Sequence, residues 1–90
     1  MTTIEHIREQ LAALDPLKIE IIDDSAMHAG HAGARSGGGH FRVMIVSARF
    51  GGKGTMARHR MVYDALGKLM QQEIHAVSIT AKTPEENHSS

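Results

Sequence analysis

The stretch HFRVMIVSARFGGKGTMARHRMVYDALGKLMQQEIHAVSI, residues 40–79, decides the fold. Residues 40–50 are rich in Val, Ile and Phe and almost continuously apolar, which predicts a strand at the centre of a sheet. Glycines interrupt the pattern at residues 51–54, and residues 55–70 then carry their apolar side chains on one face of an expected helix. Residues 75–83 return to a strand pattern. The stretch therefore predicts a strand, helix, strand unit whose helix packs on a sheet.

Two further elements precede this unit. Thr2 and Glu5 have the spacing of a capping box, and apolar residues recur at steps of three and four as far as Leu14, which predicts a first helix within residues 1–16. Residues 17–23 alternate apolar and charged side chains, as a half-buried strand does. The order helix, strand, strand, helix, strand predicts an α+β sandwich, with helices packed over a three-stranded mixed sheet.

The connection between the first two strands has its own character. Residues 24–39 contain five glycines and two histidines and show no hydrophobic periodicity. We expect a flexible loop there, and its length in so small a protein suggests either a function or disorder. Residues 84–90 are expected to form an abbreviated or frayed C-terminal tail. The length of the chain predicts one domain over residues 1–90.

Geometry predicts that histidines far apart in the sequence meet at one edge of the sheet. A strand, helix, strand unit returns the chain in the same direction by a right-handed crossover, so its two strands should be parallel. His40 and His75 begin these strands and should share an edge with the loop that carries His28 and His31. Neutral imidazole binds zinc, copper and iron. A histidine at the end of a strand can equally be structural, so both interpretations stay open.

Composition restricts the classes of function. Ten Lys and Arg residues balance ten Asp and Glu residues, so no global positive field attracts nucleic acid or an anionic membrane. The chain has no cysteine, which excludes a disulfide, a redox CxxC motif and an iron–sulfur cluster held by this chain alone. No apolar run approaches roughly 18 residues and no signal-peptide pattern is present. We therefore expect a cytoplasmic protein that does not contact membranes.

An enzyme is the class that the sequence favours least. It has no cysteine nucleophile, no P-loop and no paired carboxylates in an apolar setting. The serines near histidines, Ser36 and Ser47, lack any motif that would activate them. We therefore expect a protein without catalytic activity.

Four separated motifs resemble those of the BolA family. They are the strand HFRVMIVSARF from His40, the helix start RHRMVYDAL from Arg58, the strand start HAVSI from His75, and HAGHAG at residues 28–33, which resembles the loop of the family's histidine-type members. The resemblance covers residues 4–86. It implies the class II KH-like form of the α+β sandwich, with a short terminal helix.

The resemblance also implies a partner and a cofactor. Proteins of this family join a monothiol glutaredoxin, whose cysteine and bound glutathione complete a shared 2Fe-2S cluster, in iron–sulfur cluster trafficking or iron regulation. The ligands on this side would be His31 and His75, with His28 and His40 as alternates. Alone, the chain would be a monomer without a cofactor.

The other histidines receive different expectations. His59, together with Arg58 and Arg60, is expected to contribute to a partner-binding surface at the start of the second helix. His6 and His88 are expected to be merely exposed.

Nucleic-acid binding, as a transcriptional regulator, is the alternative function. A local basic patch is formed by Arg49, Lys53, Arg58 and Arg60, and the residues 51–54 have the GxxG spacing with which KH domains clamp a phosphate backbone. A KH clamp joins two helices, however, whereas this one joins a strand to a helix. The zero net charge and the scarcity of aromatic residues also predict only weak binding to DNA or RNA.

Overall fold

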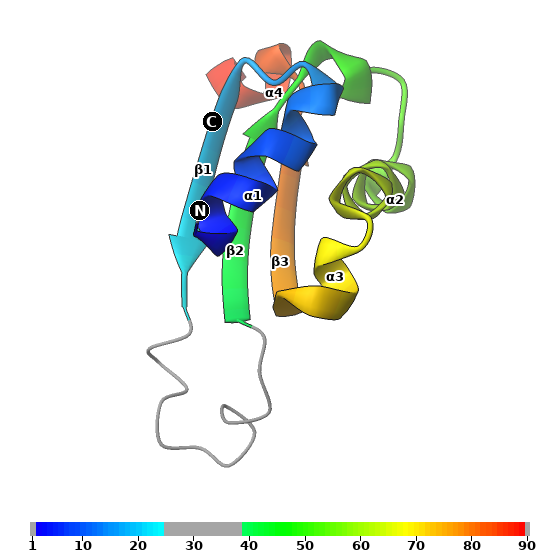
Figure 1. The fold of residues 1–90 in the computed structure, drawn as a ribbon. Coiled ribbons are helices and arrows are strands. Elements are labelled where there is room, and N and C mark those ends of the chain that lie inside the picture. Colours follow the sequence, from blue (N-terminus) through cyan, green and yellow to red (C-terminus); the bar gives the residue numbers. More distant parts are fainter. Residues whose placement is uncertain (1, 25–38, 90) are drawn as a thin grey trace.

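The computed structural model describes residues 2–24 and 39–89 (Figure 1). The main elements, in chain order, are α1 (Thr3–Leu11), β1 (Lys18–Asp23), β2 (Gly39–Val46), α2 (Thr55–Leu66), α3 (Leu69–Gln72), β3 (Ile74–Lys82) and α4 (Pro84–Ser89). Short 3-10 helices follow α1 at Ala12–Leu14 and β2 at Ala48–Phe50. No helix within these described ranges has the length and apolar character that crossing a bilayer requires.

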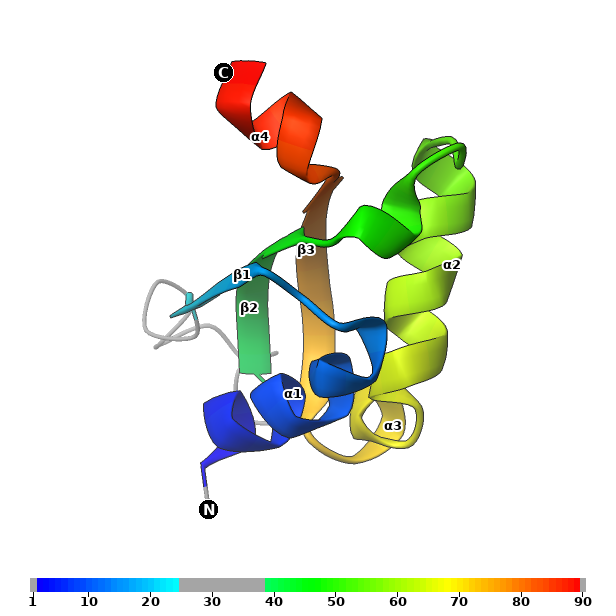
Figure 2. The same ribbon diagram turned by 90° about the horizontal axis from the view of Figure 1, so that it is seen from above.

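The three strands form one mixed sheet in the order β1-β2-β3. β1 runs antiparallel to β2, and β3 runs parallel to β2, as a right-handed crossover through α2 requires. The predicted α+β class and the central position of β2 are therefore confirmed. Figure 2 shows α1 and α2 together on one face of the sheet, while α4 points away from this layer.

The core lies between that helix layer and the sheet. Phe41, Val43 and Ile45 of β2 point toward the helices and are buried, so the intervening residues of β2 face the opposite side. The helices and their connections contribute the apolar stripe that covers them: Ile7, Leu11, Leu14, Phe50, Val62, Leu66 and Leu69. The alternation along β2 thus decides that His40, next to Phe41, lies on the face away from the core.

The bounds of two predicted elements differ from those observed. The helix predicted over residues 55–70 ends at Leu66, because Gly67 takes a positive φ of 52° that no helix continues through, and α3 then forms a separate turn. The strand predicted over residues 40–50 ends at Val46. The predicted capping box is present, since Thr2 and Glu5 exchange side-chain and backbone hydrogen bonds at the start of α1.

The two ends of the sheet carry different parts of the chain (Figure 1). At the lower end in that view, β2 and β3 begin beside α3, and the Asp24 amide donates to the His40 carbonyl at 2.7 Å. At the upper end, β3 leads into α4. His28 and His31 belong to residues 25–38, which lie outside the described residues. Of the four histidines predicted to meet, the structure therefore describes only His40 and His75, at the end of the sheet where β2 and β3 begin.

Candidate metal centre at the edge of the sheet

His40 and His75 lie side by side at the start of their strands. Their ring centroids are 5.0 Å apart, and the rings are tilted by 42°. His40 is half-buried, whereas His75 is exposed. The predicted meeting of these two histidines, which are 35 positions apart in the sequence, is confirmed.

A β-bulge gives His75 its position. Gly39 pairs with Ile74 and His40 pairs with Ala76, so His75 is an extra residue on β3 at this point of the ladder. Ile74, 3% exposed, enters the core before the bulge. Bulges re-aim side chains at the edges of sheets. The sequence pattern did not reveal this bulge, because apolar alternation on either side of His75 looks like that of an ordinary strand.

His6 is not merely exposed, contrary to the expectation from sequence. Its Nδ1 lies 2.8 Å from Oε2 and 2.9 Å from Oε1 of Glu73, and Thr3 Oγ1 donates to Oε1 at 2.9 Å. Because an ionised carboxylate only accepts, Nδ1 must carry the hydrogen. The hydrogen bond from His6, with a further one from Thr3, holds the pKa of the Glu73 carboxyl below its usual value.

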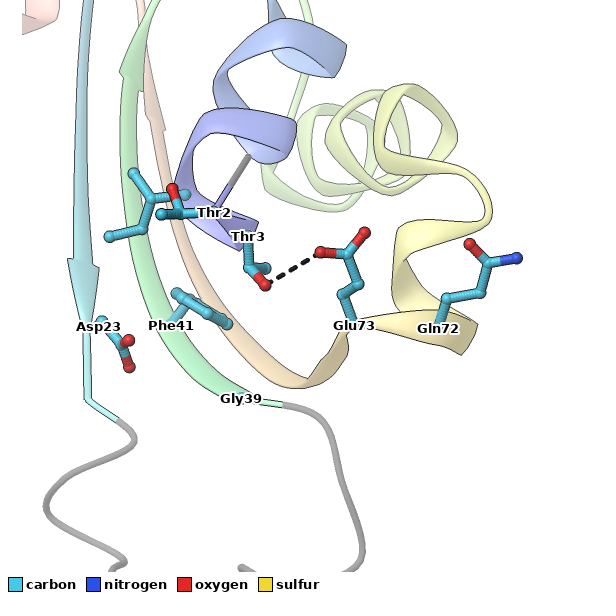
Figure 3. A pocket seen from close by; sticks show the side chains of 8 residues that line it. Thr2, Thr3, Asp23, Gly39, Phe41, Gln72 and Glu73 are labelled. Atoms are coloured by element: carbon cyan, nitrogen blue, oxygen red, sulfur yellow. Dashed lines mark hydrogen bonds between the residues drawn. The ribbon is translucent and has the colours of Figure 1, made fainter.

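Two hollows adjoin this end of the sheet. The larger, about 510 Å³, lies on the helix side and is shown in Figure 3; its lining consists of Thr2, Thr3, Ile4, Asp23, Gly39, Phe41, Gln72 and Glu73. The smaller, about 210 Å³, is lined by Asp24, His40, Phe41, Arg42, Ala76, Val77 and Ser78. The Arg42 guanidinium pairs there with Asp24 at 2.5 Å. The histidine edge is thus reached from outside the protein.

The described ligands are too few for a complete metal site. Within residues 2–24 and 39–89, no group of three or more His, Cys, Asp or Glu residues could hold a metal ion. A zinc or iron centre in a protein takes four ligands or more. The pair of His40 and His75 can therefore supply only part of a coordination sphere.

Arg58 serves the fold at the opposite end of the sheet. Its side chain is only 13% exposed, and it donates to the carbonyls of Lys53 and Ala81 at 2.8 and 3.1 Å. It also forms a two-bond ion pair with Glu86 of α4, at 2.6 and 3.1 Å. The hydrogen bond from Arg58 lowers the pKa of the Glu86 carboxyl to about 2, with a contribution from the Thr83 amide. The charge of Arg58 is thus neutralised within the chain.

The other three residues of the expected basic patch differ in whether a carboxylate pairs with them. Arg49 pairs with Asp15, whose Oδ2 lies 2.7 Å from Nε. Lys53 and Arg60 are exposed, and no ion pair joins them to a carboxylate of the described residues. His59 is half-buried and lines a groove of about 240 Å³ together with Thr55, Arg58, Ile79, Thr80, Ala81 and Lys82. Two of the four patch residues therefore keep an unneutralised charge.

The histidine pair and the start of α2 lie at opposite ends of β3. His75 stands near the beginning of the strand and Ala81, which accepts from Arg58, near its end. Six residues of strand span about 20 Å. A partner that contacts both the histidines and the surface formed by Arg58, His59 and Arg60 must extend along most of the sheet.

The fold and the edge define a class: small α+β domains with a three-stranded mixed sheet, helices on one face, and two histidine side chains side by side at one end of the sheet. The profile of the family described as BolA-like protein matches residues 11–86. The chain belongs to the BolA-like family.

Relatives in plants and bacteria support this assignment. The chain is 46% identical over 86 residues to SufE-like protein 1, chloroplastic/mitochondrial, of Arabidopsis thaliana; the match covers 89% of this chain but only 23% of that protein. It is 39% identical over 83 residues to the DNA-binding transcriptional regulator BolA of Escherichia coli, covering 91% of this chain and 76% of the relative. The solved structure of BolA1 from Arabidopsis thaliana superposes with a TM-score of 0.80 at 37% identity, over 96% of both chains.

Proposed function

We propose that the chain is a non-catalytic partner of a monothiol glutaredoxin and supplies the histidine ligands of a shared 2Fe-2S cluster. The observation that carries the proposal is the pair of a half-buried His40 and an exposed His75, side by side in a chain without cysteine. Two histidines and two thiolates are a known ligand set for a 2Fe-2S cluster. The thiolates must therefore come from the partner protein and its glutathione.

The separation of the two rings fits a shared metal atom. An imidazole nitrogen binds a metal at about 2.1 Å, which places the ring centroid about 3.2 Å from the metal. Two such rings at a tetrahedral angle have centroids about 5 Å apart, and the observed separation is 5.0 Å. Two packed rings without a metal commonly have the same separation, so the distance makes His40 a candidate for the ligand that accompanies His75 and does not select it. His31 remains the ligand that the family resemblance implies, and His28 is a further alternate.

Mixing the chain with a cluster-loaded monothiol glutaredoxin should give a coloured heterodimer. Its visible circular dichroism should differ from that of the glutaredoxin homodimer, because histidine nitrogens replace part of the sulfur coordination. Iron and sulfide added to the chain alone should leave little bound cluster, since no cysteine is present. The proposal fails if the glutaredoxin spectrum is unchanged when the chain is added to saturation.

A second candidate function is the binding of DNA or RNA. The observation that favours it is the identity to the Escherichia coli relative, which is described as a DNA-binding transcriptional regulator. Lys53 and Arg60 are the patch residues whose charge no described carboxylate neutralises. Two such charges, in a chain without net charge, support weak association at most.

We expect duplex DNA to bind weakly at physiological salt and to dissociate steeply as salt rises. Replacement of Lys53 or Arg60 by alanine should lower the affinity and flatten the salt dependence by about one unit of slope each. Replacement of Glu9, an exposed carboxylate of α1, by glutamine is the control and should change little. Tight, sequence-selective binding at physiological salt, measured by fluorescence anisotropy, would place this function first.

A further inference from the structure

We infer that the start of α1 positions the histidine pair, with Glu73 as the positioning residue that connects them. The role of the histidine pair as cluster ligands rests on the proposed function. The contacts that position the pair lie within the chain alone. Thr3 and His6 lie one helical turn apart and face the same way. Both donate to the single carboxylate of Glu73, which lies 67 residues beyond His6 in the sequence.

The backbone of Glu73 transmits this contact to both histidines. Its carbonyl accepts from the Gly39 amide at 2.9 Å, and its own amide donates to the Leu69 carbonyl at 2.9 Å. Gly39 directly precedes His40, and Glu73 is two residues before His75. The bulge of β3 follows at once, because Gly39 pairs with Ile74 while His40 already pairs with Ala76. The backbone of Glu73 thus lies where the ends of α3, β2 and β3 meet.

The contacts of Glu73 with His6 and Thr3 are partly shielded from water. The Glu73 side chain is 27% exposed and that of His6 is 33% exposed. A partly buried carboxylate that loses its donors must turn toward water or stay incompletely bonded. We expect either outcome to shift the backbone of Glu73. The ladder is least regular at this point, because His75 has no partner residue on β2. We expect a movement of Glu73 to change the spacing of the two rings, because its carbonyl accepts from the Gly39 amide and it lies two residues before His75.

The capping box of α1 is separate from this contact. Glu5 is engaged with Thr2 through the backbone amide and the hydroxyl of that residue. Thr3 and His6 are therefore not needed to cap the helix. This separation allows the positioning contact to be removed without uncapping α1.

The test uses the full chain without a cluster, and Zn²⁺ alone as the probe. In the native chain, NMR should show contact between the His40 and His75 rings, and Zn²⁺ should shift the ring signals of His75. Glu73→Ala should weaken or abolish the ring contact and lower the affinity for Zn²⁺ by about tenfold, the lower range for loss of a supporting residue. Thr3→Val should give a smaller loss in the same direction.

Two variants of His6 distinguish loss of the contact with Glu73 from a change in the stability of α1. The side-chain nitrogen of asparagine can occupy nearly the place of Nδ1, so His6→Asn should retain the contact with Glu73, while His6→Ala should lose it. Intrinsic helix propensity has the opposite order, since alanine favours a helix more than asparagine does. We expect the ring contact and the Zn²⁺ affinity to be nearly native in His6→Asn and reduced in His6→Ala.

The controls make the outcome decisive. Val62→Ala, in the core on α2, provides a destabilised chain in which the ring contact should persist. If Glu73→Ala and His6→Ala keep both the native ring contact and the native Zn²⁺ affinity, the positioning role is refuted. If the variants behave as expected but the native chain forms no mixed cluster with a glutaredoxin, the proposed function is refuted and the positioning role is supported.

Discussion

His75→Ala should abolish the mixed-ligand spectrum of the heterodimer with a cluster-loaded glutaredoxin. His75 is held by the sheet at the bulge and is the exposed member of the histidine pair. Because the substitution would remove a ligand that we propose, the loss of cluster affinity should exceed the roughly 10–100-fold that follows the loss of a supporting residue. Visible circular dichroism and the rate of cluster transfer measure the effect.

Alanine variants of His40 and His31 should identify the second ligand. His40→Ala should weaken the cluster strongly if the ring geometry identifies the second ligand, and His31→Ala should do so if the family resemblance identifies it. The variant with the smaller effect should retain a more labile or spectrally altered cluster. Glu9→Ala is the control, because Glu9 is an exposed residue of α1 outside the histidine edge. His6 is unsuitable as a control through its contact with Glu73, and His59 through its place on the expected partner-binding surface. Native behaviour of His75→Ala would contradict the ligand assignment.

Phe50→Ala should lower the free energy of unfolding by about 3–5 kcal/mol, the usual cost of truncating a buried phenylalanine. Phe50 is 0% exposed and packs in the core from the 3-10 helix that follows β2. Domains are stable by only about 5–15 kcal/mol in total, so this single change should consume a large share of the stability. Urea denaturation followed by circular dichroism gives the shift in midpoint.

Leu17→Ala is the control for that measurement. Leu17 is also a large apolar residue, but it is 71% exposed, and surface substitutions usually stay within about 0.5 kcal/mol. A Phe50→Ala chain with the same urea midpoint as Leu17→Ala would show that the core around β2 is not packed as described.

Local patterns in the sequence predicted most of the fold. The alternation of residues 17–23, the apolar run from His40 and the capping box of Thr2 and Glu5 each follow from the period of one element, and each is present in the structure. The break at Gly67 was missed because the apolar pattern continues through it. A positive φ at a single glycine decides where α2 ends, and periodicity does not report it.

Only the part of the candidate site that follows from the order and direction of the strands could be predicted from the sequence. The handedness of the crossover placed His40 and His75 at one edge, and the structure confirms it. The contact of His6 with Glu73 joins residues that are 67 positions apart, and no local spacing predicts such a pair. The same holds for Arg58, which the basic patch suggested as a binding residue and which the structure ties to Glu86 of α4.

The hydrogen bond between Asp24 and His40 has a consequence for changes in the length of the segment between them. It holds the two anchors of residues 25–38 next to each other as part of the sheet, at 2.7 Å from amide to carbonyl. Closing a loop between fixed neighbours costs only about 0.6 kcal/mol more for each doubling of its length. Changes in the length of residues 25–38 should therefore alter the free energy of folding little, because the sheet itself holds Asp24 next to His40.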